Sequence, residues 1–258
     1  MPKSFSDLLS SGRGIVGTWS QIPSPDVVEI LGASGFDFTI VDTEHGHFDL
    51  AQAGALIRAA EACGLTPLLR IAKGDAALIG KALDMGVAGV IVPRLAAPRD
   101  VADALAAGRY PPDGHRGACP CIRAGAQRVR AWSAYAARAN REALIIPLLE
   151  SRHALEQLDG ILDVPGLSVL MMGPFDLSVD LGLGGELTNA ALRASIEKAV
   201  EAIRSRQKAV IMPVFAPTPE QTAKEIVHWK SRGVNLFTVG TDKMLLADQC
   251  AAYRAALA

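Results

Sequence analysis

The strongest constraint on the fold is a regular alternation between two kinds of segment along the chain. Eight short runs rich in β-branched and other apolar residues alternate with longer stretches whose apolar residues are spaced three or four apart. The runs are 15–19, 38–41, 67–71, 89–92, 144–149, 168–172, 209–214 and 237–240. Because they are almost continuously apolar, they predict strands buried on both faces, as in a parallel sheet. Eight strand–helix units therefore predict an α/β fold, the TIM (β/α)8 barrel.

The length of the chain fits one barrel. It has 258 residues, and such barrels commonly run to about 250 residues as a single unit. No linker of Gly/Ser-rich or Pro-rich composition interrupts the alternation, so we expect one domain over 1–258, with a short helix at about 4–11. The alternative is an open doubly wound sheet, which needs a Gly-rich phosphate-binding turn after the first strand. Gly12 and Gly14 precede that strand instead.

Composition excludes several classes of function. With 26 Lys and Arg against 27 Asp and Glu, the formal charge is −1, which offers no field for a nucleic-acid backbone. No apolar run approaches the roughly 18 residues that span a bilayer, and the N-terminus lacks the apolar core of a signal peptide. We therefore expect no nucleic acid, no membrane and a cytoplasmic location. Four Cys are too few for a disulfide scaffold, and Cys119 and Cys121 lack the second Cys pair of a typical zinc site.

Ionisable residues follow several of the predicted strands, where TIM barrels place their reactive groups. Glu150 follows the fifth strand and Asp176 the sixth. Two carboxylates on adjacent strands suit a hard divalent cation such as Mg²⁺ or Mn²⁺, although each could simply be a surface carboxylate. His45 follows the second strand beside Asp42 and Glu44, and an imidazole there suits general acid–base work near neutral pH.

Two further charged residues occupy positions that are costly without a partner. Arg70 ends the third apolar strand and needs either a structural carboxylate or an anionic ligand; its geometry favours a bidentate grip on a substrate carboxylate. Asp84 falls in the last turn of a helix, where its charge opposes the helix dipole. It is expected either to orient a histidine or to pair with Lys81. The irregular stretch 109–127 is of a length typical of lids and binding loops.

These residues stand within segments whose order and spacing match a known family. The segments are Gly17-Thr-Trp19, 33–37 through Asp42-Thr-Glu44-His45, Arg70, Lys81-Ala-Leu-Asp84-Met-Gly86, Val92-Pro93, 109–117, Glu150 and Gly173-Pro174-Phe175-Asp176-Leu177-Ser178. Together they resemble the HpcH/HpaI aldolase family, the class II pyruvate aldolases that act on 4-hydroxy-2-oxo acids. The resemblance extends in register from about residue 12 to the C-terminus.

The resemblance implies a barrel of the phosphoenolpyruvate/pyruvate type and a homo-oligomer, usually a hexamer built as a trimer of dimers that exchange the final helix. It implies that Glu150 and Asp176 bind the divalent metal, with Mg²⁺ or Mn²⁺ favoured and Co²⁺ or Zn²⁺ also possible. It further implies that Arg70 contacts the oxo acid near its C2 oxygen, and that His45 assists proton transfer with Asp84 as its partner.

The resemblance also implies a substrate-binding set at two strand ends. Trp19, at the end of the first strand, belongs to it, as does the turn from Gly173 to Asp176, whose backbone N–H groups would bind the substrate carboxylate. Pro174 has no N–H, so Phe175 and Asp176 are the expected donors. Phe175 is bulky where some relatives have a small residue, a departure that bears on which aldehyde the enzyme accepts.

The function expected is therefore metal-dependent cleavage of a 4-hydroxy-2-oxo acid, through a metal-bound enolate, to pyruvate (or a related 2-oxo acid such as hydroxypyruvate) and an aldehyde. A Schiff-base aldolase would need a lysine at a strand end, and none of the eight predicted ends has one. A citrate-lyase-like acyl-CoA lyase would keep the cation and the enolate but act on a different substrate. A non-catalytic barrel that binds 2-oxo acids is the third competing hypothesis.

Overall fold

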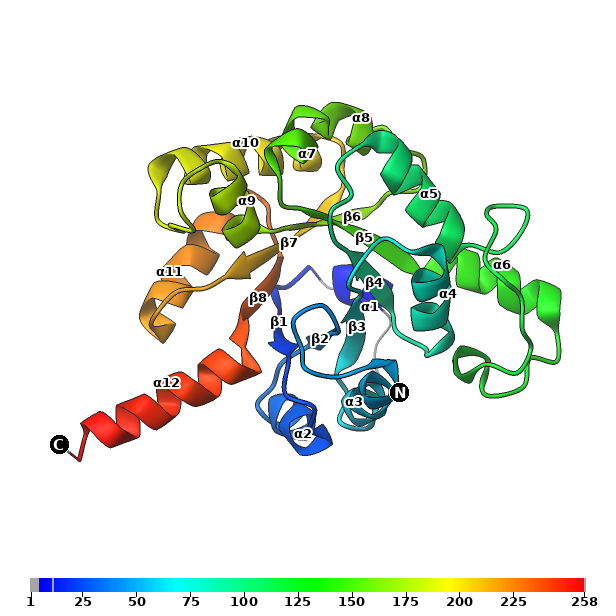
Figure 1. Ribbon diagram of the computed structural model, residues 1–258, viewed down its shortest axis with the longest axis horizontal. Coiled ribbons are helices and arrows are strands. Elements are labelled where there is room, and N and C mark those ends of the chain that lie inside the picture. The colour runs from blue at the N-terminus through cyan, green and yellow to red at the C-terminus, as the bar shows by residue number, and fades with distance from the viewer. Residues whose placement is uncertain (1–4, 11, 258) are drawn as a thin grey trace.

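Eight parallel strands close into a barrel in the order of the sequence, with the helices arranged around it (Figure 1). The computed structural model describes residues 5–10 and 12–257. The strands are β1 (Ile15–Ser20), β2 (Phe38–Asp42), β3 (Thr66–Arg70), β4 (Gly89–Val92), β5 (Leu144–Leu149), β6 (Val169–Met172), β7 (Ala209–Val214) and β8 (Leu236–Thr241). The predicted TIM barrel is confirmed, and the open doubly wound sheet is excluded because β1 pairs with β8.

The helices follow the strands as the apolar spacing predicts. They are α1 (Phe5–Ser10), α2 (Pro25–Ala33), α3 (Leu50–Ala62), α4 (Ala76–Asp84), α5 (Pro98–Gly108), α6 (Trp132–Glu142), α7 (Arg152–Glu156), α8 (Leu158–Leu162), α9 (Pro174–Asp180), α10 (Ala190–Ser205), α11 (Pro219–Lys230) and α12 (Asp242–Ala255). α2, α5 and α11 begin with proline, whose missing N–H is no loss in a first helical turn. Residues 4 and 11 of the predicted N-terminal helix lie outside the described residues.

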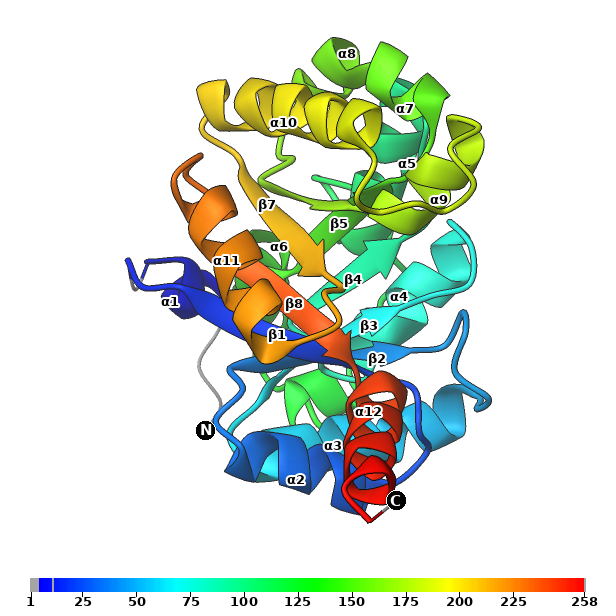
Figure 2. The same cartoon turned by 90° about the vertical axis from the view of Figure 1, so that its left-hand side faces the viewer.

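Two apolar layers hold the barrel together. One lies between the strands and the surrounding helices. The other fills the barrel interior, where Phe5 and Leu8 of α1 join side chains of the strands. The ring of Phe5 meets that of Phe38 edge-on, with centroids 5.8 Å apart. In Figure 2 the arrows of β7 and β8 point away from α1, which therefore lies at the end where the strands begin. The opposite end, where the strands finish, is left for the functional site.

The long irregular stretch lies at the end of the barrel where the strands begin. It follows α5 and precedes α6 and β5, so it belongs to a helix-to-strand connection, and such connections return the chain to the start of a strand. The N–H of His115 donates to the carbonyl of Ala106, and that of Arg116 to the carbonyl of Arg109, which fold the segment against the end of α5. The length of the stretch 109–127 suggested a lid over the strand ends. Within one chain it is not one, because it lies at the opposite end of the barrel.

α12 leaves the barrel after β8 and extends away from it to the C-terminus (Figures 1 and 2). Its apolar side chains Met244, Leu245, Leu246 and Tyr253 are 40–71% exposed. Among the helices of the described residues, none is long and apolar enough to cross a membrane.

Candidate active site

A cavity of about 400 Å³ lies at the end of the barrel where the strands finish. Its walls come from residues near the ends of β1, β3, β5, β6, β7 and β8 and from the turns that follow β1, β2, β6 and β7. Six of the residues predicted for the site line it: Trp19, His45, Arg70, Gly173, Phe175 and Asp176. A larger cavity, of about 590 Å³, lies at the other end of the barrel beside α6 and contains none of the predicted residues. The smaller cavity is therefore the candidate active site.

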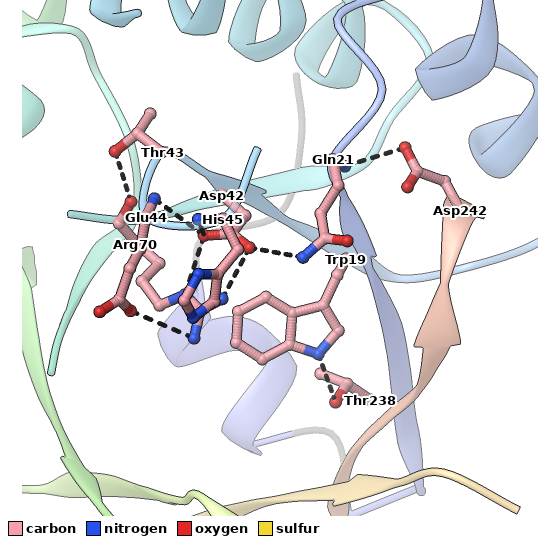
Figure 3. Close-up of polar contacts among 9 residues, drawn as sticks. All are labelled: Trp19, Gln21, Asp42, Thr43, Glu44, His45, Arg70, Thr238 and Asp242. Atoms are coloured by element: carbon pink, nitrogen blue, oxygen red, sulfur yellow. Dashed lines mark hydrogen bonds and ion pairs between the residues drawn. The ribbon is translucent and has the colours of Figure 1, made fainter. Parts of the chain in front are cut away.

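Arg70 is held by the carboxylate of Asp42 on the neighbouring strand. The two residues are register partners in the β2–β3 pair. Arg70 Nε donates to Asp42 Oδ1 at 2.9 Å and Arg70 Nη2 to Asp42 Oδ2 at 2.6 Å, while Arg70 Nη1 lies 3.3 Å from Glu44 Oε2 (Figure 3). The guanidinium carbon also lies 4.4 Å from the ring centroid of Trp19. Because Asp42 occupies the forked edge of the guanidinium, the predicted bidentate grip on a substrate carboxylate does not fit the structure.

Asp42 is fully buried, and its carboxylate is the centre of the hydrogen-bond network in Figure 3. It accepts from Arg70, from Gln21 Nε2 at 2.7 Å, and from the backbone N–H groups of Glu44 and His45. Burial by itself would raise the pKa of this carboxyl, but the hydrogen bonds and charge of Arg70, with those from Gln21 and the backbone, hold the pKa below its ordinary value. Asp42 is therefore ionised at neutral pH.

Replacing Asp42 by asparagine should destabilise the fold by about 3–5 kcal/mol at pH 7, because it leaves the buried guanidinium of Arg70 without its main counter-charge. Urea unfolding measures this. Since the folded-state pKa of Asp42 is depressed, its contribution is present above the ordinary carboxyl range and is lost as pH falls through the depressed pKa, so the difference should shrink in acid. The exposed control Asp103→Asn, paired with Arg99 on α5, should cost less than about 1 kcal/mol. Equal costs for the two variants would contradict this account.

Glu150 and Asp176 come from adjacent strand ends; Asp176 lines the cavity, whereas Glu150 is not among its lining residues. Glu150 directly follows β5, and Asp176 lies in the first turn of α9, which begins after β6. A side chain at Gly173 would have its Cβ only 2.6 Å from the Cβ of Glu150, so this position needs glycine for Glu150 to keep its place. Arg94, whose φ of 59° is unusual for a residue with a side chain, donates its backbone N–H to Glu150 Oε1 at 2.7 Å.

Glu150 is an acid whose surroundings disfavour its ionised form. Burial above all, and then the negative charges of Asp176 and Glu44, raise the pKa of Glu150 to about 7, against the opposing effects of the Arg94 N–H and the Arg70 charge. A bound cation would relieve this repulsion, and two carboxylates suit Mg²⁺ or Mn²⁺, which retain several water or substrate oxygens as ligands. No cluster of three or more Asp, Glu, His and Cys able to hold a metal occurs in the described part of the chain, so Glu150 and Asp176 would have to be completed by such oxygens.

His45 and Asp84 are not brought together within one chain. His45 lies in the turn after β2 and lines the cavity. Asp84 is the last residue of α4, which runs back from the end of β3 toward the barrel end where strands begin. Its carboxylate accepts from Arg116 Nη2 at 2.6 Å. The partner of Asp84 is therefore Arg116, and not the expected Lys81 or the His45 of the same copy.

The network around Asp42 includes residues that the sequence did not assign to the site. Gln21, which directly follows β1, contacts two acidic side chains of this network. The Gln21 side chain donates to Asp42, and the Gln21 backbone N–H donates to Asp242 Oδ2 at 2.9 Å. Glu44 sits beside Arg70, and burial is the main cause that raises its pKa. Thr238 accepts the indole N–H of Trp19 at 3.1 Å. For Gln21, Glu44 and Asp242 the one available signal was position, because each follows an apolar strand, whereas Thr238 lies within β8.

Known proteins resemble this chain in sequence and in fold. The chain matches the model of the HpcH/HpaI aldolase/citrate lyase family over residues 16–248. A hydroxypyruvate/pyruvate aldolase of Deinococcus radiodurans is 34% identical over 247 residues, which cover 96% of this chain and 87% of the relative. A 4-hydroxy-2-oxo-heptane-1,7-dioate aldolase of Salmonella arizonae is 32% identical over 247 residues, 96% of this chain and 91% of the relative. The crystal structure of the citrate synthase SbnG superposes with a TM-score of 0.87 at 28% identity, covering 98% of this chain and 96% of the other.

Proposed function

The chain belongs to the HpcH/HpaI aldolase/citrate lyase family, and we propose that it is a divalent-metal-dependent aldolase. The proposed reaction is the reversible cleavage of 4-hydroxy-2-oxo acids to an aldehyde and pyruvate, or a related 2-oxo acid such as hydroxypyruvate. As a member of this family it is a carbon–carbon lyase. The observation that carries the proposal is the position of Arg70, His45 and Asp176 on one cavity, with Glu150 packed against Gly173.

Glu150 and Asp176 are the residues that we propose hold the cation, Mg²⁺ or Mn²⁺ in the first place and Co²⁺ or Zn²⁺ in the second. When bound, a divalent cation supplies Lewis acidity toward the oxygens of a 2-oxo acid. The N–H groups of Phe175 and Asp176, which as first-turn donors of α9 have no acceptor within the helix, are proposed to bind the substrate carboxylate. Trp19 supports the site by packing on the guanidinium of Arg70.

Arg70 and His45 carry the proposed bond cleavage. His45 removes the proton of the C4 hydroxyl, the electron pair of the C3–C4 bond moves toward the C2 oxygen, and the aldehyde leaves. Arg70, rigidly oriented by Asp42, donates a hydrogen bond to the C2 oxygen as negative charge develops on it. The enolate then takes up a proton at C3 and becomes pyruvate. In the synthetic direction His45 removes a C3 proton of pyruvate.

The exposed apolar side chains of α12 support a proposal about assembly. Within one chain, 40–71% of the surface of each of these side chains stays exposed: Met244, Leu245, Leu246 and Tyr253. We propose that α12 packs on a second copy, as in the hexamer of exchanged dimers that the resemblance implies.

A direct test of the reaction is hydrogen–deuterium exchange at C3 of pyruvate, followed by NMR in the absence of any aldehyde. We expect exchange with Mg²⁺ or Mn²⁺, none after chelation, and no borohydride-trapped adduct, because no lysine occurs among the described residues that line the cavity. Lys208 instead donates to the Leu167 carbonyl at the start of the barrel. Exchange that survives chelation together with a trapped adduct would favour a Schiff-base aldolase. No exchange with any metal would leave the acyl-CoA lyase, tested with acetyl-CoA, or a non-catalytic barrel.

A further inference from the structure

We propose that Gln21 is a positioning residue for the reaction, because its amide group holds the Asp42 carboxylate that orients Arg70. The inference rests on the proposed function and adds a residue that acts on Arg70 and not on the substrate. Gln21 directly follows β1, which pairs with β2 on one side and with β8 on the other. It therefore reaches both neighbouring strand ends, that of β2 through its side chain and that of β8 through its backbone.

Gln21 contacts Asp42 at the same oxygen that Arg70 uses. Asp42 Oδ2 accepts from Arg70 Nη2 at 2.6 Å and from Gln21 Nε2 at 2.7 Å (Figure 3). The other oxygen, Oδ1, accepts from Arg70 Nε and from the backbone N–H groups of Glu44 and His45. Without the Gln21 amide, Arg70 Nη2 is the donor that remains at Oδ2 in the described part of the chain. The carboxylate and the guanidinium bonded to it are then free to turn together about Oδ1.

The pair that Gln21 holds is almost completely buried. Asp42 is fully buried and Arg70 is 7% exposed, whereas Gln21 lines the cavity at the strand ends. An apolar side chain at position 21 would leave one oxygen of a buried carboxylate short of a donor, in a network whose members strengthen one another. Catalysis is sensitive to such a change, since a displacement of about 1 Å at a positioned group costs up to about 10²-fold in rate.

Gln21 is itself fixed from the other side by Asp242, the first residue of α12. Asp242 is 4% exposed, and its Oδ2 accepts from the backbone N–H groups of Gln21 at 2.9 Å and of Ile22 at 2.8 Å. Its Oδ1 accepts the N–H of Lys243 at 2.7 Å. A continuous series of contacts therefore joins the start of α12 to the guanidinium of Arg70 through Gln21 and Asp42. Asp242 is accordingly expected to act on the reaction through Gln21.

The test is Gln21→Met, which nearly preserves the length of the side chain and removes its amide. Release of pyruvate from a 4-hydroxy-2-oxo acid is measured with saturating Mg²⁺ or Mn²⁺. We expect kcat to fall by about tenfold and KM to change by less than about twofold, because the variant disturbs Arg70 and removes no contact with the substrate. The control is Gln221→Met, at an exposed residue of α11 that lines a different cavity, and it should keep kcat within about a factor of two.

A double-mutant cycle shows whether Gln21 acts through the arginine. In the Arg70→Lys background, Gln21→Met should lower kcat further by less than about twofold, because the group that Gln21 positions is already absent. Asp242→Asn should lower kcat in the natural protein and lose this effect in the Gln21→Met background. Additive losses in the cycle with Arg70 would mean that Gln21 acts independently of the guanidinium, which overturns the inference.

Two further results would also overturn it. One is an unchanged kcat in folded Gln21→Met, and the other is a raised KM at constant kcat, which would make Gln21 a substrate-binding residue. Circular dichroism and size-exclusion chromatography report whether the variant folds and assembles as the natural protein does. If it does not, Gln21→Glu takes its place, because it has the same size, puts a like charge beside Asp42 and predicts the same loss of kcat. If the natural protein releases no pyruvate with any metal, the proposed function fails and the inference with it.

Discussion

Replacing Arg70 by lysine should lower kcat for 4-hydroxy-2-oxo acid cleavage by about 10²–10³-fold, the usual cost of removing a preorganised donor to a developing oxyanion. Nε and Nη2 of Arg70 donate to the two oxygens of Asp42, and Nη1 lies beside Glu44. These contacts hold the guanidinium in one orientation at the cavity wall. A lysine ammonium is a point charge and cannot satisfy Asp42 in a bidentate manner while it also reaches the C2 oxygen. The measurement is steady-state release of pyruvate with saturating Mg²⁺ or Mn²⁺.

Two controls separate catalysis from folding in the Arg70 variant. Thermal unfolding and circular dichroism report whether Arg70→Lys is folded at the assay temperature. Arg99→Lys, at a guanidinium that is 91% exposed on α5, should keep its activity within about a factor of two, since such surface positions contribute little. A folded Arg70→Lys protein that retains more than about a tenth of the activity would contradict the role given to Arg70.

Replacing Glu150 by glutamine should abolish cation binding and, with it, cleavage, yet stabilise the metal-free protein. The loss is expected because one of the two proposed carboxylate ligands becomes a neutral amide, and we expect an affinity at least about 100-fold lower by calorimetric titration with Mn²⁺. The stabilisation follows from the raised pKa of Glu150, about 7 in the folded protein. The matched variant Glu44→Gln, at an acid near Arg70 that is not a proposed ligand, should retain cation binding.

The raised pKa of Glu150 determines how the stability of the metal-free protein changes with pH. Because the folded protein holds this proton more tightly than the unfolded chain, stability falls as pH rises from about 4.5 to about 7, where Glu150 is forced to ionise. In the metal-free state the melting temperature of Glu150→Gln should therefore exceed that of the natural protein at pH 8, and the difference should shrink toward pH 5. A Glu150→Gln protein that binds Mn²⁺ normally, or that is destabilised at pH 8, would contradict the proposed role of Glu150 as a metal ligand.

Sequence alone predicted the barrel because its signals are local. Each strand is a short apolar run that begins and ends within one residue of the predicted bounds, and β4, β5 and β7 show no shift at either end. The same logic placed Glu150 and Asp176 at adjacent strand ends, since parallel strands in a barrel finish at one edge. Burial of the strands on both faces is what makes these runs so distinct.

The ion-pair partners that lie on other elements were much harder to predict from the sequence. Asp42 could have been expected beside Arg70 only once the register between β2 and β3 was known, and a shift of one residue would separate them. The pairing of Asp84 with Arg116 joins the end of α4 to a loop 32 residues later, which no local pattern indicates. The length of the stretch 109–127 favours a lid, but its place between α5 and β5 puts it at the opposite end of the barrel.

We propose that two carboxylates at the strand ends make this barrel a metal-dependent aldolase, and the metal dependence of pyruvate release tests this most directly. Pyruvate release from a 4-hydroxy-2-oxo acid is followed in chelator-treated protein before and after addition of Mg²⁺, Mn²⁺, Co²⁺ or Zn²⁺, with Glu150→Gln treated in parallel. We predict no release before addition, recovery with at least Mg²⁺ or Mn²⁺, and no recovery in the variant. Release that is independent of the metal, or equal recovery in Glu150→Gln, would contradict the account.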